Sequence, residues 1–421
     1  MDFIKSLFKG DKYIWGVFMV MVLISGIAMY SASSTLAYRS SEYYRPAFSH
    51  LTHLIFGTIL VLIVHNLPAR ILRGMGLLAY PFTLLFLVLV MATPQVNGAS
   101  RQMMGFQPSE LAKFVTVAVV AALLAKGRTQ EGISKQSYYM ILALSGIPCL
   151  LILKENFSTA ILLGAVIFSL MYLAKVQTKR LLTLLGGVAL GGILFVGVLT
   201  LVPADKLPGR MPTWKARLER SGEDLVNEKI NDKNRQAQFG HMAVANGGFI
   251  GKFPGNSQIR DFLPQAYSDF IYSIIIEEGG LILGGGVVMF LYLFLLIRAG
   301  IIYKRCQVYF PRLLLMGVTL LIVYQALMSM AVGVGIFVTG QPLPLISRGG
   351  TSIMMTCIYF GVILSVSRIN GEDEEGDFQN FQQLSTNQET EEGAETPEAN
   401  PAETEEAVEA APAAEKEMYP Y

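Results

Sequence analysis

Charged residues are scarce in this sequence. They make up 15% of its 421 residues, whereas a soluble globular protein carries about 25%. Hydrophobic residues reach 52%, and the mean hydropathy is +0.46. Only three cysteines and four histidines are present, and their spacing is not typical of a disulfide framework or a zinc site. These absences argue against a soluble enzyme and a cysteine-stapled domain, and they favour a polytopic membrane protein.

Two of the histidines, His50 and His53, lie one helical turn apart in an apolar segment. A pair of this kind without a third ligand is more typical of ordinary packing than of a metal site. We therefore assign no metal ligands from the sequence.

Long apolar runs are the main feature that is present. Ten segments are long enough to cross about 30 Å of hydrocarbon as helices. They lie at 13–33, 48–66, 72–93, 109–126, 138–154, 157–174, 181–202, 270–297, 312–337 and 350–368. The turn at Glu155-Asn156 separates the fifth from the sixth and predicts a tight helical hairpin. The predicted fold is an all-α polytopic integral membrane protein with ten transmembrane helices.

The distribution of Lys and Arg predicts the orientation. With a cytoplasmic N-terminus, most basic residues of the short loops fall inside, as the positive-inside rule requires. An even number of spans then places the C-terminus inside too. The one large loop, 203–269 between the seventh and eighth helices, is extracytoplasmic. The first apolar segment is too long for a signal-peptide core, so we expect it to remain as the first helix.

Acidic charge is concentrated at the C-terminal end. Residues 371–421 contain sixteen of the 32 acidic residues and one of the 33 basic residues, so residues 1–370 carry a net charge of +16. We expect 1–370 to form the membrane domain and 371–421 to be a disordered cytoplasmic tail. The tail is either a solubilising extension or a docking segment for a basic partner.

Ionisable residues inside membrane spans are candidates for a functional site. Glu110 and Lys113 lie three residues apart at the start of a span, so they share a helical face. Two interpretations remain open. They form an ion pair that stabilises the helix end, or Lys113 presents a cation to an anionic lipid headgroup.

Three more acids lie around the eighth span. Asp269, beside Ser268, stands at the outer end of the span, where it either caps the helix or acts as a general base. Glu277 and Glu278 lie deeper, where a lipid-facing carboxylate would cost at least ~2.5 kcal/mol. They must therefore face the bundle interior, a wet cavity or a basic partner.

Two further outer patches are glycine-rich. The stretch "FGHMAVANGGFIG" is too short to span and is predicted to be re-entrant or interfacial, with Gly247 and Gly248 permitting close approach of a ligand. The second patch, 338–352, contains Ser347 and Arg348 among prolines and glycines. Together with 97–113, these patches predict a cavity that opens outward at the lipid–water interface.

Five motifs in order resemble those of the SEDS family (shape, elongation, division and sporulation) of peptidoglycan polymerases. They are "NGASR" (97–101), "QPSELAKF" (107–114), "AVANGGFIGK" (243–252), "FLPQAYSDFIYSIIIEEGG" (262–280) and "TGQPLPLISRGGTS" (339–352). The resemblance covers about residues 10–370 and is strongest to the division branch, with the rod-elongation branch as the alternative.

The resemblance implies glycosyl transfer from lipid II on the outer face of the bacterial inner membrane, at the division septum. Asp269 matches the family's essential acid. The candidate substrate-binding residues are Lys113, Arg101, Arg210, Glu110, Gly247, Gly248, Ser347 and Arg348, and the candidate supporting residues are Glu277, Glu278 and Ser268. A divalent cation (Mg²⁺ or Mn²⁺) at the pyrophosphate is compatible with this chemistry, but no ligand set can be assigned. The implied partners are a class B penicillin-binding protein and other division proteins, with no nucleic acid.

The sequence departs from the family pattern at several positions, including Asn156, Phe337 and Arg348. Arg348 stands where a tyrosine is usual and adds a potential contact for pyrophosphate. The alternatives in other functional classes are a lipid II flippase and a non-catalytic scaffold. The absence of an internal repeat and the clustering of polar patches on one side argue against a transporter.

Overall fold

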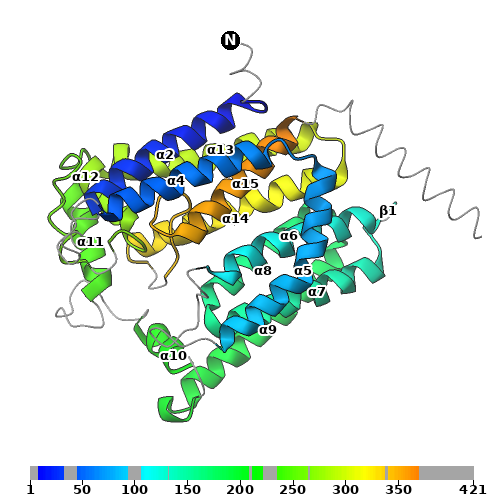
Figure 1. Cartoon of the computed structure of the whole chain (residues 1–421). Coiled ribbons are helices and arrows are strands. Elements are labelled where there is room, and N and C mark those ends of the chain that lie inside the picture. The colour runs from blue at the N-terminus through cyan, green and yellow to red at the C-terminus, as the bar shows by residue number, and fades with distance from the viewer. Residues whose placement is uncertain are drawn as a thin grey trace, which may run out of the picture. The chain divides into compact units, whose positions relative to one another are not determined.

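The computed structural model describes residues 8–32, 45–92, 106–130, 132–207, 211–220, 235–263, 266–336 and 340–368. These ranges are mostly helical (Figure 1). The helices are α2 (Lys12–Ala32), α4 (Arg45–Val64), α5 (Ala69–Met91), α6 (Pro108–Lys126), α7 (Lys135–Glu155), α8 (Phe157–Leu173), α9 (Thr178–Leu201), α10 (Met211–Arg220), α11 (Arg235–Gly247), α12 (Ile271–Gly279), α13 (Val287–Arg305), α14 (Tyr309–Gly333) and α15 (Gly350–Arg368). A 3₁₀ turn η1 (Ala204–Lys206) and a π-helical segment η2 (Gly280–Gly286) complete them. One short antiparallel ladder pairs β1 (Arg128–Thr129) with β2 (Gly132–Ile133).

The apolar helices agree with a polytopic membrane protein. Nine helical segments in the described ranges are long and apolar enough to cross a membrane. The sixth expected span, α8, has 17 residues and falls just below that length. Only Asn156 separates α7 from α8, which confirms the predicted hairpin. Helices are the expected form because hydrocarbon offers no partners for backbone polar groups.

The eighth expected span, 270–297, is not one straight helix. α12 ends at Gly279, Gly280 has φ +75°, and the chain continues as the π-helical η2 before α13. The Tyr272 hydroxyl donates to the Gly285 carbonyl at 3.1 Å. Thirteen residues of straight helix would separate these residues by about 20 Å. The chain therefore folds back on α12, and α13 extends to Arg305 instead of ending at 297.

Three helices form the centre of the packed bundle. α14 is 83% buried in its apolar window, and α6 and α15 are each 72% buried. α4 packs on α15, α5 on α6, and α13 on α14. Small residues bring these backbones together: Gly57 of α4 lies against Cys357 and Gly361 of α15 lies against Val64.

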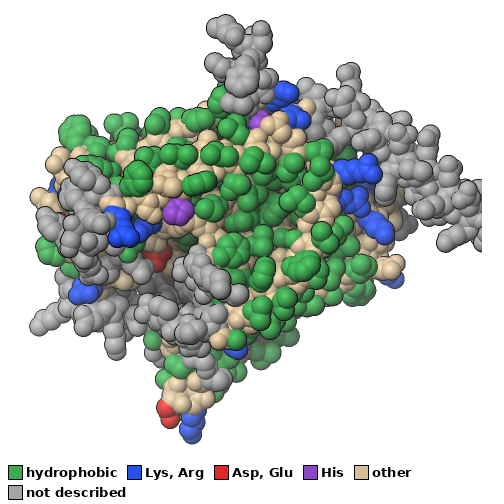
Figure 2. All heavy atoms as spheres, in the orientation of Figure 1, with side chains coloured by type: hydrophobic (Ala, Val, Ile, Leu, Met, Phe, Trp, Pro, Cys, Tyr) green, Lys and Arg blue, Asp and Glu red, His purple; other side chains and the backbone are tan. Residues whose placement is uncertain are grey.

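The outer surface of the bundle is apolar. Figure 2 shows one face covered by hydrophobic side chains, with Lys and Arg toward its margins. α9 is the extreme case, because only 6% of its apolar window is buried. Such a surface is expected to contact lipid rather than water.

Candidate functional site

The glycine-rich segment after α11 wraps around the end of α12. The backbone N–H groups of Lys252 and Phe253 donate to the carbonyls of Glu277 and Glu278, at 3.0 and 2.7 Å. A Cβ on Gly247 would overlap the Ile276 carbonyl, and a Cβ on Gly251 would overlap that of Glu278. The close approach that these glycines permit is therefore to α12. The predicted approach of a ligand to Gly247 stays a prediction.

Gly248 differs from its neighbour. Its φ is +53°, it is exposed, and a Cβ there would meet nothing within 4 Å. The segment that follows exposes several large apolar side chains, listed here: Phe249, Ile250, Phe253 and Phe262. Exposed aromatic and aliphatic side chains fit the predicted interfacial position of this segment.

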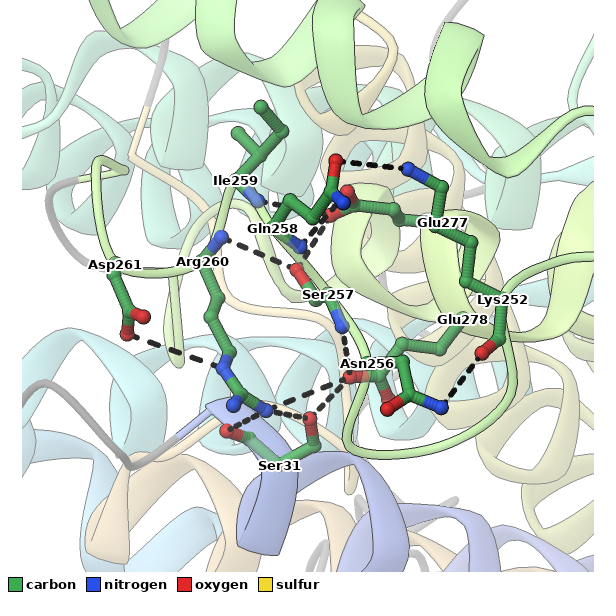
Figure 3. A network of polar contacts seen from close by, with 10 residues as sticks. All are labelled: Ser31, Lys252, Asn256, Ser257, Gln258, Ile259, Arg260, Asp261, Glu277 and Glu278. Atoms are coloured by element: carbon green, nitrogen blue, oxygen red, sulfur yellow. Dashed lines mark hydrogen bonds and ion pairs between the residues drawn. The ribbon is translucent and has the colours of Figure 1, made fainter.

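Glu277 is fully buried and accepts hydrogen bonds from the loop that wraps it (Figure 3). Its Oε1 accepts from Asn246 Nδ2 at 3.2 Å and from the Gln258 N–H at 3.1 Å. Its Oε2 accepts from Ser257 Oγ at 2.5 Å and from the Ile259 N–H at 3.4 Å. Four donors thus replace water around this carboxylate.

Glu278 joins the same loop to α2 (Figure 3). Its carboxylate accepts from Ser31 Oγ, and the Ser257 N–H lies 3.4 Å from its Oε1. The Arg260 guanidinium is 3.9 Å from the same oxygen and also donates to Ser31 Oγ at 3.0 Å. The two glutamates therefore hold the 246–260 segment in place.

Asp269 is half-buried on the segment that leads into α12. It accepts a hydrogen bond from Ser268 Oγ at 3.2 Å. The N-cap of α12 is Phe270, so Asp269 stands one residue before the capping position. Asp269 is therefore not the N-cap residue of α12.

The loop before α15 holds this segment. Ser347 Oγ donates to the Ser268 carbonyl at 2.7 Å and accepts the Leu343 N–H at 2.7 Å. The Arg348 N–H donates to the Tyr267 carbonyl at 2.9 Å. Ser347 is 1% exposed, so it acts by fixing the backbone beside Asp269 rather than by contacting an outside ligand.

Glu110 and Lys113 lie in the bundle interior. Pro108 occupies the first turn of α6, as expected from the sequence. The Lys113 ammonium is 2.9 Å from Glu110 Oε1 and donates to Gln325 Oε1 of α14 at 2.6 Å. The Lys113 side chain is 0% exposed. Of the two alternatives, the structure has the ion pair, and the ammonium is not accessible to a headgroup outside the bundle.

A pocket of about 370 Å³ lies beside Tyr267. It is lined by Ser49, His50 and His53 of α4, by Tyr267, and by Arg348 and Gly350 near the start of α15. From their spacing alone, we expected ordinary packing for the two histidines. Their i, i+3 spacing indicates only that they share a face of α4. It does not reveal that Arg348 lines the same pocket.

Two predicted cations, Arg101 and Arg210, lie outside the described residues. Within the described ranges, no group of three or more His, Cys, Asp or Glu side chains could hold a metal ion. The residues that the structure does bring together are Ser268, Asp269, Ser347 and Arg348.

Curated proteins are similar to this chain over most of its length. The "Probable peptidoglycan glycosyltransferase FtsW" of Saccharophagus degradans is 31% identical over 377 residues, which cover 85% of this chain and 93% of that protein. The protein of the same name from Marinobacter nauticus is 32% identical over 362 residues, which cover 82% and 87%.

Two solved structures share the fold. One chain comes from a structure described as "structural coordination of polymerization and crosslinking by a peptidoglycan synthase complex", with a TM-score of 0.69 at 23% identity, covering 86% of this chain and 99% of that one. The rod shape determining protein RodA of Thermus thermophilus has a TM-score of 0.61 at 23% identity, covering 86% and 98%.

The family model for FtsW, RodA and SpoVE, described as "Cell cycle protein", matches residues 11–372. This match spans the five motifs and every described helix, and it confirms the SEDS resemblance. The chain therefore belongs to the FtsW/RodA/SpoVE family of cell cycle proteins.

Proposed function

We propose that this protein is a peptidoglycan glycosyltransferase that polymerises lipid II into glycan strands during cell division. The names of its curated relatives support glycosyl transfer and the division branch. The observation that carries the proposal is the setting of Asp269. This half-buried carboxylate accepts a hydrogen bond from Ser268 and lies two residues after Tyr267, which lines a pocket together with Arg348.

The proposed chemistry follows from this setting. A sugar hydroxyl is a poor nucleophile, so its attack needs a base. Asp269 removes the proton from the 4-hydroxyl of the acceptor N-acetylglucosamine. That oxygen then attacks the anomeric carbon of the donor N-acetylmuramic acid, with inversion, and the bond to the lipid pyrophosphate breaks. Cations near the leaving group stabilise the charge that develops on it.

The other predicted residues take different roles in the proposal. Lys113 and Glu110 position α6 against α14 from the interior, since their pair is buried. Glu277 and Glu278 hold the loop that ends at Asp269. Arg101 and Arg210 remain proposed ligands of the pyrophosphate. A divalent cation would share that role, and its ligands remain unassigned.

The proposed topology has ten spans, including the 17-residue α8, with both termini in the cytoplasm. The bias of Lys and Arg supports it. The loop 203–269 is then outside, where lipid II is polymerised. We assign residues 1–370 to the membrane domain and 371–421 to a cytoplasmic tail. The proposed location is the septal inner membrane, together with a class B penicillin-binding protein and other division proteins.

The test is polymerisation of labelled lipid II by the purified protein, with and without its transpeptidase. Asp269→Asn is expected to lower the rate by about 10²–10⁴-fold, the range for removal of a general base. Asp261→Asn is the matched control, because Asp261 lies in the same loop with a side chain 49% exposed.

Long glycan strands from wild type and Asp261→Asn, and none from Asp269→Asn, would support the proposal. No strands from any of the three, with the partner present and the protein folded, would contradict it. That outcome would favour the flippase, and lipid II flipping in liposomes would then be measured.

A further inference from the structure

Two tyrosine rings lie where α13 ends and α14 begins, at one end of the helical bundle. The Tyr303 hydroxyl, near the end of α13, donates to the Leu173 carbonyl at 3.1 Å. The Tyr309 hydroxyl, at the start of α14, donates to the Ala174 carbonyl at 3.2 Å. Both acceptors belong to the end of α8. These hydrogen bonds fix the two rings against the connection between α8 and α9.

Two guanidinium groups lie against these rings. The guanidinium of Arg312, one turn into α14, is 4.0 Å from the centre of the Tyr303 ring and 6.0 Å from that of Tyr309. The guanidinium of Arg128, on β1, is 4.5 Å from the centre of the Tyr309 ring. Since both groups approach the ring of Tyr309, they form one cluster, although they come from segments far apart in the sequence. We call these four residues the Arg–Tyr cluster.

The two arginines of the cluster have no polar partner among the described residues. Neither side chain forms an ion pair or donates a hydrogen bond there. The Nε of Arg312 is buried and has no hydrogen-bond acceptor among the described residues. Arg298, at the same end of the bundle, differs because its guanidinium is 2.6 Å from the Asp11 carboxylate. Guanidinium groups that are oriented by rings but lack an acceptor favour an anionic ligand.

The Arg–Tyr cluster lies at the border of the apolar surface. Ile297 of α13 is 62% exposed and precedes Tyr303 by six residues, or about 9 Å of helix. Leu182 of α9 is 62% exposed as well. Toward the same end of these two helices, Lys304 and Lys179 are exposed. Exposed apolar side chains thus give way to cations within two turns, which is typical of the level of the lipid headgroups.

We propose that Arg128 and Arg312 bind the phosphodiester of an anionic phospholipid from the surrounding bilayer. The planar guanidinium groups match the oxygens of a phosphate, and the tyrosine rings hold them in place. Basic clusters between membrane helices are known to bind such headgroups. In the proposed topology the lipid belongs to the cytoplasmic leaflet. The inference requires that the apolar helices lie in a membrane, but it does not depend on the proposed glycosyl transfer.

The test is a titration of the detergent-purified full chain with dioleoylphosphatidylglycerol, in which native mass spectrometry gives the Kd of the first bound lipid. Arg312→Gln is expected to weaken binding about tenfold, the effect of one charge-assisted hydrogen bond. Arg128→Gln is expected to weaken it about fivefold, because Arg128 is exposed. Arg312→Lys keeps the charge but not the planar group, so it should also weaken binding.

Lys135→Gln is the matched control, because it removes one exposed positive charge at the first residue of α7. Its affinity should equal that of wild type. Equal affinity of wild type, Arg128→Gln and Arg312→Gln would overturn the inference. A loss in Lys135→Gln as large as that in Arg128→Gln would also overturn it, because net charge alone would then explain binding. If Arg312→Gln lowers the thermal midpoint without lipid, Arg128→Gln on the short β1–β2 ladder decides the test.

The source of the phosphate is tested in two further titrations of wild type. Dioleoylphosphatidylcholine carries a compensating positive charge, so its affinity should be lower and should not change in Arg312→Gln. Inorganic phosphate, at the concentration at which phosphatidylglycerol saturates, should not displace that lipid. Displacement by inorganic phosphate would overturn the lipid assignment in favour of a soluble anion. Equal, Arg312-independent binding of both lipids would overturn the site itself.

Discussion

Glu277→Gln replaces a fully buried carboxylate with an amide of nearly the same shape. Each carboxylate oxygen accepts one backbone N–H, from Gln258 at 3.1 Å and from Ile259 at 3.4 Å. An amide has a single oxygen, so its NH₂ group faces one of these two donors in either orientation. The substitution therefore leaves one of these donors without its acceptor, either the buried Ile259 N–H or the partly buried Gln258 N–H.

The expected cost follows from these contacts. An unsatisfied buried donor costs about 1–3 kcal/mol, and the loss of charge assistance in the remaining bonds adds about 1 kcal/mol. We therefore expect Glu277→Gln to lower the free energy of unfolding by about 2–4 kcal/mol. A decrease of 2 kcal/mol in the free energy of local opening makes hydrogen exchange roughly thirtyfold faster. The exchange should increase at the amides of 257–260, where the loop contacts α12.

The assay combines thermal unfolding in detergent with hydrogen exchange measured by mass spectrometry. Asn246→Ala is the control, because it removes one exposed donor at 3.2 Å and leaves no buried donor without an acceptor. It should cost about 1 kcal/mol or less. If Glu277→Gln and Asn246→Ala behave alike in both measurements, the carboxylate does not hold the loop and the reasoning is refuted.

Four further substitutions test the packing around the site. Lys113→Met leaves a buried carboxylate unpaired and should lower the free energy of unfolding by about 3–5 kcal/mol, measured by chemical denaturation. Gly251→Ala places a Cβ against the Glu278 carbonyl at φ +87° and should lower the thermal midpoint strongly, whereas Gly248→Ala, with open space around its Cβ, should cost only about 1–2 kcal/mol of backbone strain. A midpoint that falls equally in both glycine variants would contradict the packing argument. Ser347→Ala removes the hydrogen bond to the Ser268 carbonyl, just before Asp269. We expect the rate of glycan synthesis to fall while the thermal midpoint changes little. A loss of rate that only accompanies a large loss of thermal midpoint would argue that Ser347 does not position Asp269.

Most of the membrane helices could be predicted from the sequence because a bilayer imposes one local requirement. A long apolar run must satisfy its backbone within itself, so it becomes a helix wherever it occurs. Helix ends are less predictable. α13 continues to Arg305, beyond the apolar run that ends near 297, because helical hydrogen bonds do not depend on apolar side chains.

The break at Gly280 shows what hydropathy does not detect. The run 270–297 is apolar throughout, yet Gly280 adopts φ +75° and the chain folds back on α12. Glycine permits this conformation, but it does not require it. The packing of 248–253 against α12 selects it, and that contact joins segments about thirty residues apart.

The motifs alone determined the family and drew attention to Asp269, because their order and residue types are a property of the chain itself. Hydropathy alone determined where most helices lie. The tertiary structure decided which polar groups meet. It placed Lys113 in a buried ion pair, and it brought His50 and Arg348, nearly three hundred residues apart, into one pocket. Such contacts depend on the packing of α4 against α15, and no local pattern in either segment specifies that packing.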